Sequence, residues 1–297
     1  DVRIEERPIP EINDDEVLVK VMACGICGSD VMEWYRIKKA PIVLGHEIAG
    51  IVEKTGKNVK NFKIGDRVFV SHHVPCMKCH YCLNSHHTAC ETLHKTNFDP
   101  GGFAEYLRVP KINLEFGTFK LPQNISFDEG TFIEPIGTVV RAQRLAGLGE
   151  NQTLLIIGSG ISGLMHVKVA KSKNVKKIIA VDINEYRMNA AKRFGAYHAF
   201  NANDNPISKI KEINENRLAD VVIVCTGALK AAQQALTCVD KGGTILFFAV
   251  PKPEEKMEIP ITDFWRNEVR IMTSYGAAPN DLEESIKLIE SKKLNLH

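Results

Sequence analysis

The sequence has almost no net charge and no long apolar run. Its 297 residues include 38 Lys or Arg and 36 Asp or Glu, which gives a formal charge of +2 at pH 7. Because nucleic-acid-binding proteins normally show a basic stripe, we expect no nucleic-acid partner. No apolar stretch approaches the roughly 18 residues that a membrane-spanning helix needs, so we expect no membrane insertion.

The chain also lacks a signal peptide at its start, an internal repeat and a low-complexity segment. Of its 8 cysteines, half are gathered in one short segment. The others are scattered, at Cys24, Cys27, Cys225 and Cys238. This usage is typical of metal ligands and packing residues in a reducing compartment, so we expect a cytoplasmic protein.

The gathered cysteines are Cys76, Cys79, Cys82 and Cys90. Their short spacing brings four thiolates within reach of one tetrahedral zinc ion. Disulfides are the alternative, but cysteines so close together in tight turns pair poorly. A four-thiolate site has no open position, so this zinc is expected to be structural and to stabilise a lobe with little apolar core.

The rest of the sequence changes rhythm near residue 140. Before it, short strands with Gly and Pro between them (16–21, 48–53, 62–70) predict a β-barrel-like domain. After it, apolar runs at 154–157, 178–181, 221–224 and 244–248 alternate with helical patterns at 163–173, 185–194 and 228–238. This alternation predicts an α/β domain with a parallel sheet covered on both faces. The predicted domains are 1–140 with the zinc lobe 76–90, 141–275, and a further segment 276–297.

A glycine-rich turn lies where the first of these strands becomes a helix. Its residues are Gly158, Ser159, Gly160, Ile161, Ser162 and Gly163. Gly158 would permit the tight turn, Gly160 a close approach of pyrophosphate, and Gly163 close packing of helix on strand. The free N–H groups of Ile161 and Ser162 at the helix start would face the phosphates.

An acid, Asp182, ends the next strand about 20 residues later, as dinucleotide sites require. It would accept hydrogen bonds from the adenosine ribose, and its charge would disfavour a 2′-phosphate, so the pattern favours NAD over NADP. Arg187 is placed to soften that preference, although it also fits a solvated helix position.

A second set of metal-binding residue types lies in the first domain. Cys27 is followed by Gly, Ser and Asp, and His46 lies between Gly45 and Glu47. Together with other motifs in order, these resemble the zinc-dependent medium-chain dehydrogenases, which include alcohol, polyol and threonine dehydrogenases. The motifs are Cys-Gly-Ser-Asp at 27–30, Gly-His-Glu at 45–47, Gly-Asp-Arg-Val at 65–68, the cysteine lobe, Gly-Gly-Phe-Ala-Glu-Tyr at 101–106, Glu-Pro at 134–135 and the glycine turn.

The resemblance implies a GroES-like catalytic domain, a Rossmann domain, two zinc ions per chain and NAD. Cys27 and His46 would bind a catalytic zinc. Glu47 would bind that metal or approach it during turnover, and Glu134 would bind it directly or through water. Asp30 would hold the zinc-bound His46, and Ser29 would take the proton of the substrate.

Three departures from the family pattern stand out. Met32 replaces a histidine that relays the proton to solvent in many members, so another exit route is needed, through ribose hydroxyls and water or through a histidine of the lobe. The chain also looks short at both ends, lacking the first strand and the final segment of the family.

We read the histidines near the lobe as surface residues; they are His72, His73, His80, His86, His87 and His94.

We therefore predict a zinc-dependent oxidoreductase that transfers a hydride from a secondary alcohol to NAD. Glu134-Pro135 favours a polyol, sugar or cyclitol substrate, since this pair resembles the sorbitol dehydrogenase branch. An L-threonine 3-dehydrogenase-like enzyme and a non-catalytic, zinc-stabilised NAD-binding protein are the alternatives. Family resemblance further implies a homodimer or homotetramer.

Overall fold

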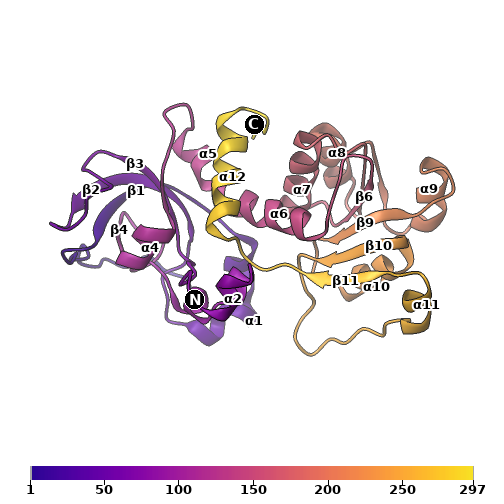
Figure 1. Cartoon of the computed structure of the whole chain (residues 1–297), viewed down its shortest axis with the longest axis horizontal. Helices are drawn as coiled ribbons and strands as arrows, with labels where there is room; N and C mark the ends of the chain where they lie inside the picture. Colours follow the sequence, from indigo (N-terminus) through magenta and orange to yellow (C-terminus); the bar gives the residue numbers. More distant parts are fainter. Residues whose placement is uncertain (1, 297) are drawn as a thin grey trace. The chain divides into compact units, whose positions relative to one another are not determined.

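The computed structural model describes residues 2–296, which form two compact units (Figure 1). One unit runs to Gly137 and resumes at Gly276, and the other comprises Thr138–Tyr275. The chain passes from the first unit to the second within helix α6 (Ile133–Leu145) and leaves the second after strand β11 (Arg270–Thr273).

An antiparallel sheet of five strands forms the centre of the first unit, in the order β4-β1-β2-β3-β5. The strands are β1 (Val17–Gly25), β2 (Glu47–Thr55), β3 (Arg67–Ser71), β4 (Tyr106–Val109) and β5 (Thr118–Lys120). Branched apolar residues such as Val19, Ile48 and Val70 are fully buried on this sheet. They suit a pleated surface with one side in the core, which explains the strand assignment.

The register of this sheet gathers particular residues at one end. Gly25 at the end of β1 faces Glu47 at the start of β2, and Glu47 in turn faces Ser71 at the end of β3. Because neighbouring strands are antiparallel, the residues just before β2 and just after β3 meet at this same end. His46 and His72 occupy those two positions.

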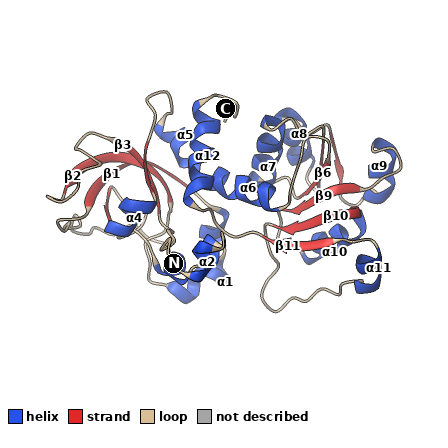
Figure 2. Cartoon of the chain, in the orientation of Figure 1, coloured by secondary structure: helices blue, strands red, loops and turns tan. Residues whose placement is uncertain are grey.

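Short helices connect the strands of the first unit, and most are only one or two turns long (Figure 2). They are η1 (Gly28–Val31), α1 (Glu33–Arg36), η2 (Ile37–Lys39), α2 (His80–Leu83), η3 (His87–Ala89), α3 (Glu91–Lys95), α4 (Lys111–Phe116) and α5 (Phe127–Thr131). The longer α12 (Pro279–Glu290) belongs to the resumed part of the chain. It packs closely on the start of α6, since a Cβ added at Gly137 would lie 2.9 Å from a methyl group of Leu282.

The second unit is built on a six-stranded parallel sheet with the order β11-β10-β9-β6-β7-β8. Its other strands are β6 (Thr153–Ile157), β7 (Lys177–Asp182), β8 (His198–Asn201), β9 (Ala219–Val224) and β10 (Val239–Phe247). The first strand in sequence, β6, lies beside both β7 and β9, so the strand order reverses there. This is the doubly wound Rossmann arrangement, whose ligands bind at the reversal.

Helices alternate with these strands along the chain. They are α7 (Ile161–Ser172), α8 (Glu185–Phe194), α9 (Pro206–Ile213), α10 (Leu229–Cys238) and α11 (Ile261–Arg266). Two separate apolar clusters, one containing Leu155 and Val222 and the other Leu154 and Val221, lie on opposite faces of the sheet. Strand β6 is buried along its whole length, which confirms the predicted parallel sheet covered on both sides.

The predicted α/β fold class is confirmed, while some elements differ from the sequence-based expectation. Strand β8 and helix α9 had no counterpart in the prediction. All four residues of β8 are only half-buried, so this strand lacks the continuous apolar run that identified the others. Among the described residues, no helix combines the length and hydropathy needed to cross a membrane.

Candidate metal and cofactor sites

The four cysteines of the lobe converge in space. The Sγ atoms of Cys79 and Cys82 lie 3.6 Å apart, as do those of Cys76 and Cys90, and all four sulfurs lie within 4.8 Å of one another. Zinc–sulfur bonds of about 2.3 Å place tetrahedral sulfurs about 3.8 Å apart, so the four thiolates fit a zinc ion. All eight cysteines of the chain are free thiols.

Local structure explains this convergence. Cys79 occupies the N-cap position of α2 and Cys90 that of α3, which sets the direction of both side chains without a hydrogen bond from either sulfur to its helix. The backbone N–H of Cys76 donates to the Cys90 sulfur at 3.4 Å, as donors around a zinc thiolate do. The apolar cluster of the lobe contains Leu93 besides the cysteines themselves. Such a small core needs the metal to hold it together.

A second convergence lies at the end of the five-stranded sheet. Ligand atoms of Cys27, His46 and Glu47 all lie within 4.8 Å of one another. His46 and Glu47 are buried, and Cys27 is half-buried. A thiolate, an imidazole and a carboxylate are the ligands that a catalytic zinc site combines, and three protein ligands leave an open position.

The sheet register and a missing side chain make room for this cluster. Glu47 begins β2 opposite Gly25, the last residue of β1. A Cβ at Gly25 would collide with the Oε2 atom of Glu47. Glycine at this position therefore lets the Glu47 carboxylate turn toward Cys27 and His46, a requirement that the sequence pattern did not reveal.

The electrostatics of the cluster also indicate a cation. Burial and the neighbouring charge of Glu134 raise the pKa of Glu47 to about 7. Burial likewise raises the pKa of Glu134. Although burial lowers the pKa of His46, hydrogen bonds with Asp30 and Cys27 raise it to about 10. Several acids thus share a buried space, and a divalent cation would relieve their repulsion.

Glu134 lies in the first turn of α6, where Pro135 is also tolerated. Its charge acts on both His46 and Glu47, but its carboxylate is not among the three groups that converge within 4.8 Å. The structure therefore places Glu134 near the candidate metal centre and outside its tightest ligand set.

Asp30 lies behind His46. One carboxylate oxygen, Oδ1, is 3.4 Å from His46 Nδ1, while the other, Oδ2, accepts from the backbone N–H of Cys27 at 3.2 Å. A metal binds the neutral imidazole, in which an Nδ1–H bond to the Asp30 carboxylate leaves the lone pair of Nε2 for that metal. Ser29 follows Cys27 in the same turn, and its backbone N–H donates to the Cys27 sulfur at 3.4 Å.

The interpretation of His72 as a surface residue is wrong. The His72 and His46 rings lie 4.6 Å apart, and the His72 and His73 rings 3.8 Å apart. The Nδ1 atom of His72 is buried and has no hydrogen-bond partner among the described residues. Burial holds the pKa of His72 well below its ordinary range, so the ring is neutral. The pairing of β2 with β3 brings His72 next to His46. The prediction assigned His72 to the lobe because it lies close to the cysteines in the sequence.

The remaining lobe histidines follow the expectation only in part. His80, His86 and His94 are exposed, whereas His73 and His87 are half-buried.

The glycine turn has the geometry expected of a dinucleotide site. Gly158 follows β6 with φ +96°, a conformation that favours glycine, and Gly160 caps α7. A Cβ at Gly163 would collide with the carbonyl oxygen of Gly158, so helix and strand approach closely there. A Cβ at Gly160 would meet nothing within 4 Å, which leaves open space beside the N–H groups of Ile161 and Ser162. These features fit a bound pyrophosphate.

Asp182 ends β7 as predicted, and its carboxylate is tied to the backbone. Its oxygens accept from the N–H of Ser159 at 2.7 Å and from the N–H of Asn184 at 2.9 Å. Each oxygen keeps a second lone pair for a ribose hydroxyl. Arg187, an exposed residue of α8, brings Nη1 to 4.0 Å from Asp182 Oδ2. The bond to Ser159 shows that Asp182 also orders the glycine turn.

Comparison with known proteins identifies the family of both units. Residues 13–122 match the family model of the alcohol dehydrogenase GroES-like domain, and residues 162–291 match that of the zinc-binding dehydrogenases. The chain is 35% identical to a probable D-xylulose reductase A of Aspergillus fumigatus, over 99% of this chain and 85% of the relative. It is 36% identical to a sorbitol dehydrogenase of Bacillus subtilis, over 86% of this chain and 74% of the relative.

A solved structure extends the likeness to the whole fold. A protein of Escherichia coli CFT073 named as a short chain alcohol dehydrogenase, complexed with NADH, superimposes with a TM-score of 0.86 at 29% identity, and the match covers 97% of this chain and 84% of that chain. The fold and these family matches define a zinc-containing, nicotinamide-dependent oxidoreductase. The chain belongs to the zinc-dependent medium-chain alcohol and polyol dehydrogenase family.

Proposed function

We propose that this protein oxidises a secondary alcohol group of a polyol, sugar or cyclitol with NAD, and reduces the corresponding ketone in reverse. The observation that carries the proposal is the convergence of Cys27, His46 and Glu47, with Asp30 behind the histidine. The names of the xylulose reductase and sorbitol dehydrogenase relatives support polyols as the substrate class.

In this proposal the chain contributes a fixed set of groups around the reacting carbon. Cys27, His46 and Glu47 would hold a catalytic zinc, and Asp30 would keep His46 in the tautomer that leaves Nε2 available. Glu134, whose charge acts on this cluster, would bind the metal directly or through water. When bound, zinc supplies Lewis acidity that favours loss of the alcohol proton, and NAD accepts the hydride.

Ser29 takes the proton of the alcohol. Its hydroxyl lies in the turn after Cys27 and accepts a hydrogen bond from Arg36 at 2.8 Å. Arg36 has no lone pair to accept a proton, so the route beyond Ser29 does not continue through it. Met32, half-buried in the next turn, offers no relay either. Water or the cofactor ribose must complete the route.

The proposal assigns binding of the cofactor pyrophosphate to Gly158, Gly160, Gly163 and the start of α7. Asp182 accepts hydrogen bonds from the adenosine ribose hydroxyls. The four-thiolate lobe holds a second zinc ion, which is structural. NAD is the preferred cofactor because a 2′-phosphate beside Asp182 would meet a carboxylate, and Arg187, whose Nη1 lies 4.0 Å from that carboxylate, is exposed.

The function is tested by initial rates with NAD and NADP over xylitol, sorbitol, galactitol, myo-inositol, L-threonine and 2-propanol, with Cys27→Ser as the control enzyme. We expect NAD-linked turnover of at least one polyol and none in the control. Turnover of L-threonine alone would replace the polyol assignment. NAD binding without turnover of any alcohol would favour a non-catalytic protein.

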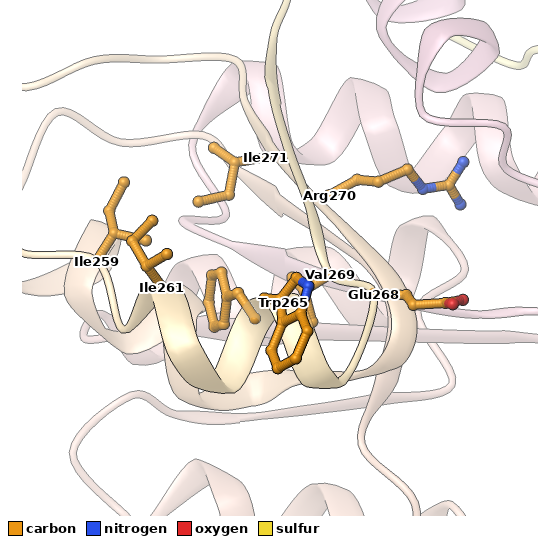
Figure 3. A pocket seen from close by; sticks show the side chains of 8 residues that line it. Ile259, Ile261, Trp265, Glu268, Val269, Arg270 and Ile271 are labelled. Carbon is orange, nitrogen blue, oxygen red and sulfur yellow. The ribbon is translucent and has the colours of Figure 1, made fainter.

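We also propose that the protein self-associates as a homodimer or homotetramer, with a second copy of this chain docking at β11. This strand is the last of the parallel sheet, and the groove beside it is lined by apolar side chains including Ile261, Trp265 and Ile271 (Figure 3). Trp265 is 76% exposed. An open strand edge can pair with its own copy across a two-fold axis, which makes a second copy the self-complementary occupant.

Light scattering coupled to size exclusion tests this association. We expect a multimer for the wild type and for Tyr197→Lys, which alters another exposed aromatic residue, and a smaller species for Trp265→Lys. A monomeric wild type would contradict the proposal.

A cytoplasmic location remains part of the proposal as well. It is supported by the free state of all eight cysteines, since a four-thiolate zinc site needs reduced sulfurs. Fractionation of the native cells, with detection of this chain in the cytosolic or in another fraction, decides it.

A further inference from the structure

Arg36 makes a set of contacts beside the candidate metal centre that no motif indicated. Its Nε donates to the backbone carbonyl of Ser29 at 2.9 Å, and its Nη2 donates to the Ser29 hydroxyl at 2.8 Å. The same Nη2 donates to Oδ1 of Asp30 at 3.0 Å. One guanidinium group thus contacts both residues that follow Cys27 and Gly28.

The carboxylate oxygen that Arg36 contacts is also the one facing His46. Asp30 Oδ1 lies 3.0 Å from Arg36 Nη2 and 3.4 Å from His46 Nδ1. The Asp30 side chain is 3% exposed and that of Arg36 is 20% exposed, so this pair is largely shielded from water. A shielded, charge-assisted bond is stronger and more directional than one at the surface.

The hydroxyl of Ser29 is oriented by the same contact. A serine hydroxyl rotates among three staggered positions unless a partner selects one. Because Arg36 can only donate, it occupies one lone pair of Ser29 Oγ and leaves the other lone pair and the hydroxyl proton for the substrate side. The second bond, to the Ser29 carbonyl, fixes the backbone of the turn.

The local fold holds Arg36 in place. It ends α1, where its N–H donates to the carbonyl of Met32 at 3.0 Å, and its guanidinium lies 5.1 Å from the Tyr35 ring centroid. Lys39 Nζ lies 4.8 Å from the same ring. The planar fork of arginine suits the bridge, whereas a lysine would provide a single point of charge.

We propose that Arg36 is a positioning residue that orients, through one guanidinium, both the proton-accepting hydroxyl of Ser29 and the carboxylate of Asp30 that holds His46. The inference rests on the proposed function for its role in turnover. Its effect on the metal centre, through Asp30 and His46, is measurable without substrate.

The first test follows release of zinc to a chromogenic chelator from the purified holoprotein. The zinc of the four-cysteine lobe serves as the internal reference in the same sample. For Arg36→Met we expect about tenfold faster release of the zinc held by Cys27, His46 and Glu47. This is near the lower limit of the 10–100-fold loss of metal affinity that is typical when a partner of a metal ligand is removed. Lys38→Met, which removes an exposed charge from the same segment, should release both ions as the wild type does.

The second test distinguishes the simultaneous contact of the Arg36 guanidinium with Ser29 and Asp30 from the effect of its positive charge alone. Arg36→Lys should restore only part of the lost zinc retention and kcat, because an ammonium group cannot span Ser29 and Asp30 in one plane. In an Asp30→Asn background, Arg36→Met should change zinc release by less than about twofold, since the contact it would break is already weakened.

Three results would overturn the proposal: wild-type zinc release and kcat in Arg36→Met, equal acceleration of both zinc ions, or full recovery in Arg36→Lys. The first would mean that the contact has no effect, the second that Arg36 serves only general stability, and the third that its charge alone matters. If no polyol is oxidised but the zinc-release results hold, the proposed function fails while the positioning role of Arg36 at the metal centre stands.

Discussion

A methyl group added at Gly25 should empty the candidate catalytic centre without altering a ligand residue. The Cβ of Gly25→Ala would collide with Glu47 Oε2 and lie 3.2 Å from Glu47 Cβ. The collision involves the mobile end of a side chain, so the carboxylate can turn away while the strands stay paired. A zinc ion bound by Cys27 and His46 would then lose its third protein ligand.

The structure indicates different magnitudes for stability and for metal binding. Turning Glu47 to a poorer rotamer costs about 0.5–1.5 kcal/mol. For a unit of this size that corresponds to a fall in Tm of about 1–6 °C. Losing a direct ligand should weaken zinc binding at least as much as losing an outer contact, which is about 10–100-fold.

The assay is zinc content and zinc affinity, with Tm measured on the same samples. Gly28→Ala is the matched control, because a Cβ there meets nothing within 4 Å although it adjoins Cys27. We expect one zinc ion in Gly25→Ala and two in Gly28→Ala. Two tightly bound zinc ions in Gly25→Ala, with wild-type turnover, would refute the placement of Glu47 in the metal centre.

Three other changes have defined outcomes. Cys27→Ser should abolish turnover while circular dichroism and Tm stay close to wild type; retained activity would remove Cys27 from the site. Asp182→Asn should raise the kcat/KM ratio of NADP to NAD about tenfold; asparagine keeps one of the two acceptor oxygens that pair with the N–H groups of Ser159 and Asn184, whereas alanine keeps neither; an unchanged ratio would place ribose recognition elsewhere. Burial raises the pKa of Glu129, but its bonds to Lys292 and Ser126 hold that pKa below 4.5. The stability it contributes should therefore be lost as pH falls below about 4.5, and Glu129→Gln should flatten that part of the Tm profile.

The sequence predicted those features whose determinants are close together along the chain. The cysteine lobe is such a case, since its ligands fall within one short segment and their spacing suffices. The glycine turn is another, because a strand, a turn, a helix and Asp182 follow one another directly. The four sulfurs converge and the glycine turn joins β6 to α7 in the structure, and Asp182 also accepts a hydrogen bond from Ser159 that the pattern did not contain.

Features that depend on tertiary register were missed. His72 reaches His46 only because β2 and β3 are antiparallel neighbours, and Gly25 matters only because it faces Glu47. Arg36 donates hydrogen bonds to Ser29 and Asp30 from the end of a short helix that is too brief to show a hydrophobic periodicity in the sequence. In each case the decisive contact joins residues whose types are common and whose spacing carries no signal.

The proposed chemistry requires a second metal centre that is separate from the cysteine lobe. The most direct test is zinc per chain, measured by elemental analysis, in the wild type and in Cys27→Ser. We predict two zinc ions in the wild type and one in the variant, the remaining ion being that of Cys76, Cys79, Cys82 and Cys90. One zinc ion in both proteins would contradict the account, because Cys27, His46 and Glu47 would then bind no metal.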